Sequence, residues 1–137
     1  MPGSDSLNGV TRWSPELPGG FVDFGAGVVG SAGVPVLHGI GAPARGQTCT
    51  LHADHAAPSA FALLVAGQSV AGLHVLGGVL VPSPEAVSAY LVSDAGTLDV
   101  PVAWPLEVSA AYFQLVVLDA AAPLGVAESN AVLGQVQ

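Results

Sequence analysis

The chain has 137 residues, of which only 9% are charged and 51% are hydrophobic, and its formal net charge at pH 7 is -8. This length suits one domain with a single core. The only basic residues are Arg12 and Arg45, so the chain would be repelled by a phosphate backbone and by an anionic membrane surface. We therefore expect neither as a partner. So few charges predict a surface that is either coated with Ser, Thr, Gly, Gln and backbone or partly covered by other chains.

Residues 1–20 are rich in Ser, Gly and Pro, with Trp13 as the single large side chain that could anchor them. This composition favours an extended arm or linker over a packed core. The first ten residues show no signal peptide, because they lack both a basic and an apolar stretch. The predicted domains are therefore an arm over residues 1–20 and a folded domain over residues 21–137.

From residue 21 onward, short runs of β-favouring residues alternate with Gly, Pro, Asp and Asn, and no segment has a sustained helical period with caps. The pattern predicts an all-β chain, an antiparallel β-sandwich of about seven to nine short strands with an extended N-terminal arm. The expected strands are 21–24, 36–40, 47–53, 61–66, 73–81, 87–92, 97–103, 112–118 and 125–136.

Three of these segments carry finer predictions. Apolar and polar residues alternate over 97–103, which indicates one buried and one solvated face, with Pro101 marking an edge or a bulge. The preceding SDAG, residues 93–96, is typical of a hairpin turn with Gly96 at positive φ. The segment YFQLVVL, residues 112–118, indicates a strand buried on both faces or at an interface. Cys49, the only cysteine, cannot form an internal disulfide and is expected as a small buried side chain.

The run from residue 56 to residue 84 contains no charged residue. Gly and Pro interrupt it, and its apolar pieces are far shorter than the roughly 20 residues that a spanning helix needs. It predicts buried strands and no membrane insertion.

Residues 25–33 read GAGVVGSAG, which has the G-x-G-x-x-G spacing of dinucleotide-binding turns. That fingerprint needs a helix after the turn and an acidic residue about 20 positions later. Here Gly33 and Pro35 prevent a useful helix, and residue 50 is Thr. The segment therefore predicts a turn between strands, and we expect no cofactor.

The segment HADH contains His52, Asp54 and His55, which are residue types that bind zinc. In a strand, His52 and Asp54 would share a face while His55 pointed away, so a common site needs a turn near Asp54. The alternative is an ordinary cluster at the end of a loop. No D-x-D-x-D-G loop for calcium is present. No metal is expected on these grounds, although zinc at the three candidate residues and calcium held by loops between strands both stay open.

A hydrolytic triad has no support in the sequence, because no G-x-S-x-G elbow occurs and the nearest segment is GQSVAG around Ser69. We expect no catalytic residues. Aromatic side chains could instead form a platform for sugar rings, and Trp104 is the candidate because it stands at the end of an expected strand. Packing in the core is the alternative for Trp104.

The order of several segments resembles a family of short extracellular β-sandwich modules at the C-terminal ends of large secreted proteins of planctomycete-like and other environmental bacteria. The resemblance covers about residues 21–136 and implies a secreted sandwich, without known catalytic residues. Family members often carry a Cys near Val28 or Val29, which is absent here. The matching segments are GAGVVGSAGVP (25–35), GAPARGQTCTL (41–51), ALLVAGQS (62–69), LVPSP (80–84), SDAG (93–96) and VLDAAAPLGVAESNAV (117–132).

These observations predict a non-enzymatic extracellular structural protein, a homo-oligomeric subunit of a filament, coat or surface layer at the cell surface. The arm would contact a neighbour, with Trp13, Phe21 and Phe24 as the candidate assembly contacts. The alternative is an adhesion or carbohydrate-binding accessory module of secreted proteins, with glycans as partners at Trp104. A small metal-dependent enzyme is the third hypothesis.

Overall fold

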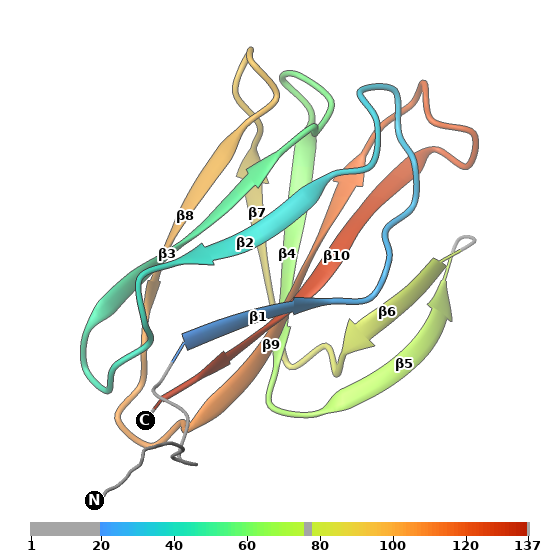
Figure 1. Cartoon of the computed structure of the whole chain (residues 1–137). Helices are drawn as coiled ribbons and strands as arrows, with labels where there is room; N and C mark the ends of the chain where they lie inside the picture. The colour runs from blue at the N-terminus through green and yellow to red at the C-terminus, as the bar shows by residue number, and fades with distance from the viewer. Residues whose placement is uncertain (1–19, 76–77, 137) are drawn as a thin grey trace, which may run out of the picture.

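The computed structural model of the chain describes residues 20–75 and 78–136. Over these residues the chain forms ten strands and no helix, which confirms the predicted all-β class (Figure 1). The strands are β1 (Gly20–Phe24), β2 (Val36–Ile40), β3 (Thr48–Asp54), β4 (Phe61–Gly67), β5 (Val70–Val75), β6 (Gly78–Pro82), β7 (Ala86–Leu91), β8 (Leu98–Ala103), β9 (Ala110–Leu118) and β10 (Val126–Gln135).

The strands pair in antiparallel fashion into three sheets. A five-stranded sheet has the order β1-β10-β9-β4-β7, a three-stranded sheet has the order β2-β3-β8, and β5 pairs with β6. Figure 1 shows the three-stranded sheet lying across the five-stranded sheet, with the β5–β6 hairpin at the lower right. The arrangement is sandwich-like, and β7 and β8 are edge strands of different sheets.

The core lies between the two larger sheets and is built from alternate residues of each strand. On β3, Cys49, Leu51 and Ala53 are buried whereas His52 is less buried. Burial also raises the pKa of the Cys49 thiol, as expected for a small apolar core residue. β8 alternates as predicted, and Pro101 lies on an edge strand, where a missing backbone donor is tolerated.

A bulge in β10 lets side chains of the five-stranded sheet bond to the three-stranded sheet on one face and to the β5–β6 hairpin on the other. The regular pairing of β10 with β9 is interrupted between Glu128 and Ala131. There the Asn130 amide acts like a strand neighbour of β2: its Oδ1 accepts from the Leu37 amide at 2.9 Å and its Nδ2 donates to the Leu37 carbonyl at 2.8 Å. One side chain thus ties the two sheets together across the core.

Gln114 of β9 makes the matching connection on the outer face of the five-stranded sheet. It is fully buried, its Oε1 accepts from the Val81 amide at 2.8 Å, and its Nε2 donates to the Val79 and Ser129 carbonyls at 3.1 and 2.9 Å. Because an unpaired buried amide would be costly, these bonds hold the β5–β6 hairpin on that face.

The glycine-rich segment 25–33 forms a turn, as its sequence predicts, and no helix follows it. Ser31 donates to Asp119 Oδ2 through its amide at 2.6 Å and its hydroxyl at 2.8 Å, and the Ala121 amide donates to Asp119 Oδ1 at 3.1 Å. Gly30 allows the close approach, since a Cβ there would lie 2.6 Å from Asp119 Oδ2. The Ser31 amide, which a bound phosphate would need as a donor, is therefore already bonded to the Asp119 carboxylate.

Two predictions, one for a strand and one for a turn, are wrong in detail. Segment 73–81 is not one strand but parts of β5 and β6, which pair with each other; the Gly77-Gly78 pair is a sequence signal for such a hairpin. The 93–96 turn is present with Gly96 at φ +80°, yet it does not form a hairpin, because β7 and β8 belong to different sheets. Val92, just after β7, is buried in the core where the chain crosses between the sheets.

The predicted arm, and Trp13 within it, lie outside the described residues apart from Gly20, which begins β1. The domain boundary near residue 20 therefore stays a prediction.

Replacing Asp119 by alanine should loosen the glycine-rich turn. The Ser31 and Ala121 amides would lose a charged acceptor, and we expect the free energy of unfolding at neutral pH to fall by about 1 to 2 kcal/mol. Burial alone would raise the pKa of Asp119, but the hydrogen bonds from Ser31 and Ala121 outweigh it and lower the pKa below the ordinary 3.8. The stabilisation is therefore present above that value and is lost as pH falls through the lower folded-state pKa.

Urea unfolding of the wild type and Asp119→Ala, at neutral pH and at about pH 2, measures this difference. The gap between the two proteins should shrink in acid. A gap of the same size at both pH values would contradict the assigned role of the carboxylate.

Candidate functional site

An apolar patch covers the outer face of the five-stranded sheet where the β5–β6 hairpin leaves it open. We call it the outer patch, and it consists of Phe61, Leu63, Val87, Ala89, Leu91, Val116 and Leu118. The pairing of β4 with β7 and β9 sets Phe61 opposite Leu91 and Leu63 between Ala89 and Val116. Phe61 and Leu91 are 64% and 60% exposed, and none of β4, β7 and β9 contains a charged residue.

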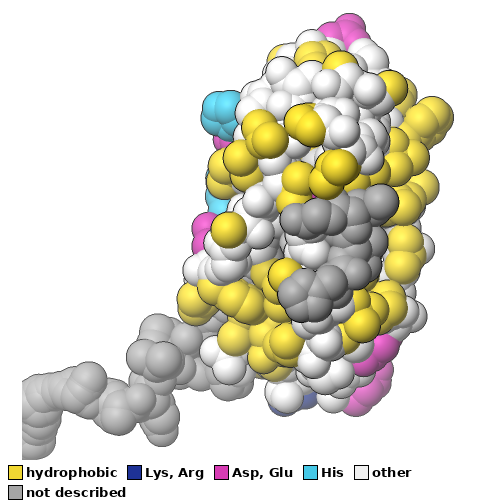
Figure 2. Space-filling model, turned by 90° about the vertical axis from the view of Figure 1, so that its right-hand side faces the viewer, with side chains coloured by type: hydrophobic (Ala, Val, Ile, Leu, Met, Phe, Trp, Pro, Cys, Tyr) yellow, Lys and Arg dark blue, Asp and Glu magenta, His cyan; other side chains and the backbone are white. Residues whose placement is uncertain are grey.

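Figure 2 shows the same distribution from the right-hand side of Figure 1. Hydrophobic side chains form a column along the right margin, on the side of the five-stranded sheet, whereas His side chains lie at the left margin, on the side of the three-stranded sheet. The two outer faces of the sandwich therefore differ in chemistry. Contiguous exposed apolar surface of this kind commonly marks an interaction site.

A pocket of about 290 Å³ opens between the start of β7 and the end of β8. Trp104 and Phe113 line it with Ala66, Ala86 and Ala103, and Glu85 is also part of its wall. Trp104 is only 3% exposed, its indole Nε1 donates to the Val108 carbonyl at 2.6 Å, and its ring lies 6.2 Å from that of Phe113. Trp104 therefore packs in the core and does not offer the exposed platform considered for sugar rings.

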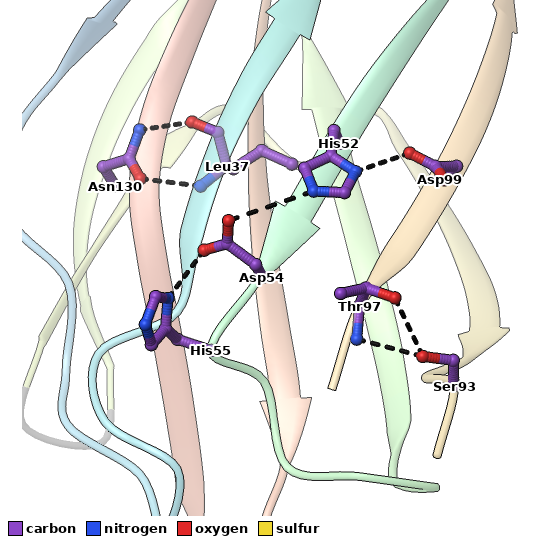
Figure 3. A network of polar contacts seen from close by, with 8 residues as sticks. All are labelled: Leu37, His52, Asp54, His55, Ser93, Thr97, Asp99 and Asn130. Atoms are coloured by element: carbon purple, nitrogen blue, oxygen red, sulfur yellow. Dashed lines mark hydrogen bonds and ion pairs between the residues drawn. The ribbon is translucent and has the colours of Figure 1, made fainter. Parts of the chain in front are cut away.

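The candidate metal ligands form a row of paired side chains on the outer face of the three-stranded sheet (Figure 3). His52 lies between two carboxylates: its Nδ1 is 2.6 Å from Asp99 Oδ1, and its Nε2 is 3.9 Å from Asp54 Oδ2. His55 adopts φ +58°, so the chain turns there, and its Nδ1 lies 2.7 Å from Asp54 Oδ1. The turn that a shared site requires is present.

The row nevertheless pairs its groups with one another. Both oxygens of Asp54 face histidine nitrogens, and Asp99 takes the other nitrogen of His52. Within residues 20–75 and 78–136, no group of three or more His, Cys, Asp or Glu residues is arranged to hold a metal ion. The His38 ring, 5.2 Å from that of His52, extends the row along β2.

Ser69, at the segment nearest to a nucleophile elbow, donates its hydroxyl hydrogen bond to Ser83 Oγ at 3.0 Å. In the part of the chain that the structure describes, no serine hydroxyl is hydrogen-bonded to a histidine. The geometry therefore offers no activated serine nucleophile among these residues.

Two of the three candidate assembly contacts are engaged within the fold. Phe21 packs against the core and lies so close to Gly39 that a Cβ there would not fit. Phe24 meets Tyr112 edge-to-face with ring centroids 5.9 Å apart. The third, Trp13, lies outside the described residues.

Glu128 of β10 is a buried carboxyl group beneath the hairpin. It is 1% exposed, and no described residue donates a hydrogen bond to its Oε1. Gly78 leaves room for it, since a Cβ at Gly78 would lie 2.7 Å from that oxygen. Burial without a partner raises the pKa of Glu128 above its ordinary 4.5.

Comparisons of the chain with protein-family models, with curated proteins and with solved structures found no match. None of the described residues forms a helix that could cross a membrane. The site assignment therefore depends on geometry and surface chemistry alone.

The sequence analysis missed the outer patch, the pocket and the roles of Asp119 and Glu128. A signal for the patch existed, because the expected strands 61–66, 87–92 and 112–118 contain no charged residue. Which of their faces stays open depends on where the hairpin lies, and that is a tertiary property.

Replacing Glu128 by glutamine should remove a pH-dependent destabilisation. Because the folded-state pKa is raised, the folded protein holds its proton more tightly than the unfolded chain, and stability falls as pH rises above 4.5 until the folded-state pKa is passed. The wild type should lose up to about 1.4 kcal/mol per pH unit more than Glu128→Gln over that window.

Thermal unfolding of both proteins at a series of pH values from about 4 to about 8 tests this expectation. Glu107→Gln, a change at an exposed carboxyl group, is the control. Parallel stability curves for the wild type and Glu128→Gln would rule out the proposed ionisation.

Proposed function

We propose that this chain is a non-enzymatic extracellular structural subunit that assembles with further copies of itself, in a filament, coat or surface layer. The single observation that carries the proposal is the outer patch, which adjoins an edge strand without protection against pairing. The extracellular setting is supported by the resemblance of residues 25–35 and 117–132 to secreted modules.

The edges of the sandwich differ in how they are protected. Exposed strand edges usually carry a charge, a proline or a covering element that prevents pairing with other chains. β8 has Asp99 and Pro101, β1 has Asp23, and β2 is tied to β10 through Asn130. β7, with the sequence AVSAYL, has none of these devices along its length. An unprotected edge beside an apolar face favours association with another copy.

The composition supports the same proposal. A net charge of -8 makes copies of the chain repel one another, so association needs a region without charge. The outer patch and β7 together provide such a region.

The alternatives have less support. Binding of sugar rings at Trp104 would need an exposed ring, and metal-dependent catalysis would need ligands that are not already paired with one another. The pocket is lined mostly by apolar side chains, which suits an apolar group better than a sugar.

Leu91→Asp should weaken self-association, because it would place a charge without a partner in the apolar contact. Loss of one buried leucine is worth about 1.5 to 3 kcal/mol, or roughly a tenfold to hundredfold change in affinity. Light scattering coupled to size-exclusion chromatography, with negative-stain microscopy of the particles, measures the effect.

The matched control is Leu124→Asp, which makes the same change of charge at a leucine outside the patch that is 53% exposed. It should assemble like the wild type. Equal effects of the two substitutions would exclude the patch as the contact, and a wild type that stays monomeric at high concentration would overturn the proposed function itself.

A further inference from the structure

The side of the sandwich between β7 and β8 is closed at one end and open at the other. At the closed end the connecting turn is held together, since the Ser93 hydroxyl lies 2.9 Å from Thr97 Oγ1. At the other end, Ala86 begins β7, Ala103 ends β8, and the pocket lies between them. Figure 1 shows the two strands diverging from their connecting loop. The pocket is therefore the wide end of a wedge between two edge strands.

The size and lining of the pocket suit one large aromatic side chain. Its volume of about 290 Å³ exceeds that of a cavity of roughly 150 Å³ that holds benzene. It lies just below the range of about 300 to 1,000 Å³ for drug-sized ligands. The indole N–H of Trp104 is already bonded to Val108, so the floor presents ring carbon and methyl groups.

The rim adds a requirement for positive charge. Glu85 is exposed at the mouth of the pocket, and its Oε2 accepts from the Ser83 hydroxyl at 2.8 Å. This leaves its second oxygen for a cation on the occupant. The pocket and its rim together fit an aromatic side chain with a basic neighbour.

The chain contains that pair once. Arg12 and Trp13 are adjacent in residues 1–19, outside the described part of the structure. The only other basic residue, Arg45, donates to the Leu106 carbonyl at 2.8 Å, and the only other tryptophan is Trp104. We propose that the pocket between β7 and β8 binds Trp13 of residues 1–19 from a second copy of the chain, with Arg12 facing Glu85.

This proposal rests on the proposed function and identifies its connecting segment. A strand added antiparallel to β7, with Trp13 opposite Ala86, directs Trp13 into the pocket, because Ala86 lies in the pocket wall. Arg12 then lies opposite Val87 on the other face, diagonal to Glu85 and within reach of it. Val10 lies opposite Ala89 and extends the outer patch. The segment 8–13 would occupy the edge, the pocket and the patch together.

The length of the chain favours a second copy over the same molecule. Gly20 lies in β1, four strands away from β7 across the sheet, which is about 19 Å. Trp13 precedes Gly20 by seven residues and can reach at most about 25 Å when fully extended. Crossing the four strands would alone use about three quarters of that fully extended length, and a path around the end of the sheet is longer. A neighbour imposes no such limit, and the contact is head-to-tail, which builds rings or filaments.

Two full-length variants separate the arm from the pocket. Trp13→Ala removes the side chain that is inserted and keeps the pocket, whereas Glu85→Arg keeps the arm and repels Arg12 at the pocket. Each alone should self-associate at least tenfold more weakly than the wild type, as measured by sedimentation velocity. Mixed in equal amounts, they should form a 1:1 pair, since the arm of the Glu85→Arg copy fits the pocket of the Trp13→Ala copy.

Asp23→Arg makes the same reversal of charge on the opposite edge strand and should associate like the wild type. Circular dichroism melts of all variants establish that they are folded, and Glu85→Gln provides a milder change should Glu85→Arg unfold. Variants that assemble like an oligomeric wild type would overturn this inference and leave the proposed function standing. Weakened variants that form no mixed pair would overturn the binding of Trp13 from one copy in the pocket of another. A monomeric wild type would overturn the proposed function as well.

Discussion

The bulge in β10 is the constraint on which the remaining architecture depends. By interrupting the pairing between Glu128 and Ala131, it frees Asn130 to bond the backbone of Leu37 on one side and exposes the Ser129 carbonyl to Gln114 on the other. Amide side chains can imitate a strand neighbour because each offers both a donor and an acceptor. The three-stranded sheet and the hairpin are thereby attached to opposite faces of the same central pair of strands.

The position of the hairpin determines where the molecule stays apolar and open. It covers the outer face over Gln114 and Glu128, so the strands nearer to β7 receive no second layer. These strands contain no charge that would make the open face compatible with water alone. The strands of the five-stranded sheet have the apolar composition of a sheet buried on both faces. The β5–β6 hairpin covers only part of the outer face, and the outer patch is the part that it leaves exposed.

Much of the fold follows from sequence, and the reasons are local. β2 and β8 could be placed because Gly or Pro lies close to their ends, and apolar and polar residues alternate along β8. The split of segment 73–81 was missed although Gly77-Gly78 offered a signal, because apolar residues continue on both sides of that pair. The site was missed for a different reason: Phe61 and Leu91 look like core residues, and only the sheet order places them on an open face. Asp119 gave no signal, since its partner Ser31 lies 88 positions away in the chain.

The contrast between the two outer faces supports the proposed assembly site over a catalytic one. On the three-stranded sheet, the titratable groups that could do chemistry are paired with each other: His52 with Asp99, and His55 with Asp54. On the five-stranded sheet, the open part of the outer face carries apolar side chains beside the edge strand β7. Unsatisfied apolar surface lowers its free energy by contact with more protein, without any substrate. A sandwich that pairs the histidines and carboxylates of one outer face with each other and leaves an apolar edge open on the other supports the proposal that it binds another chain.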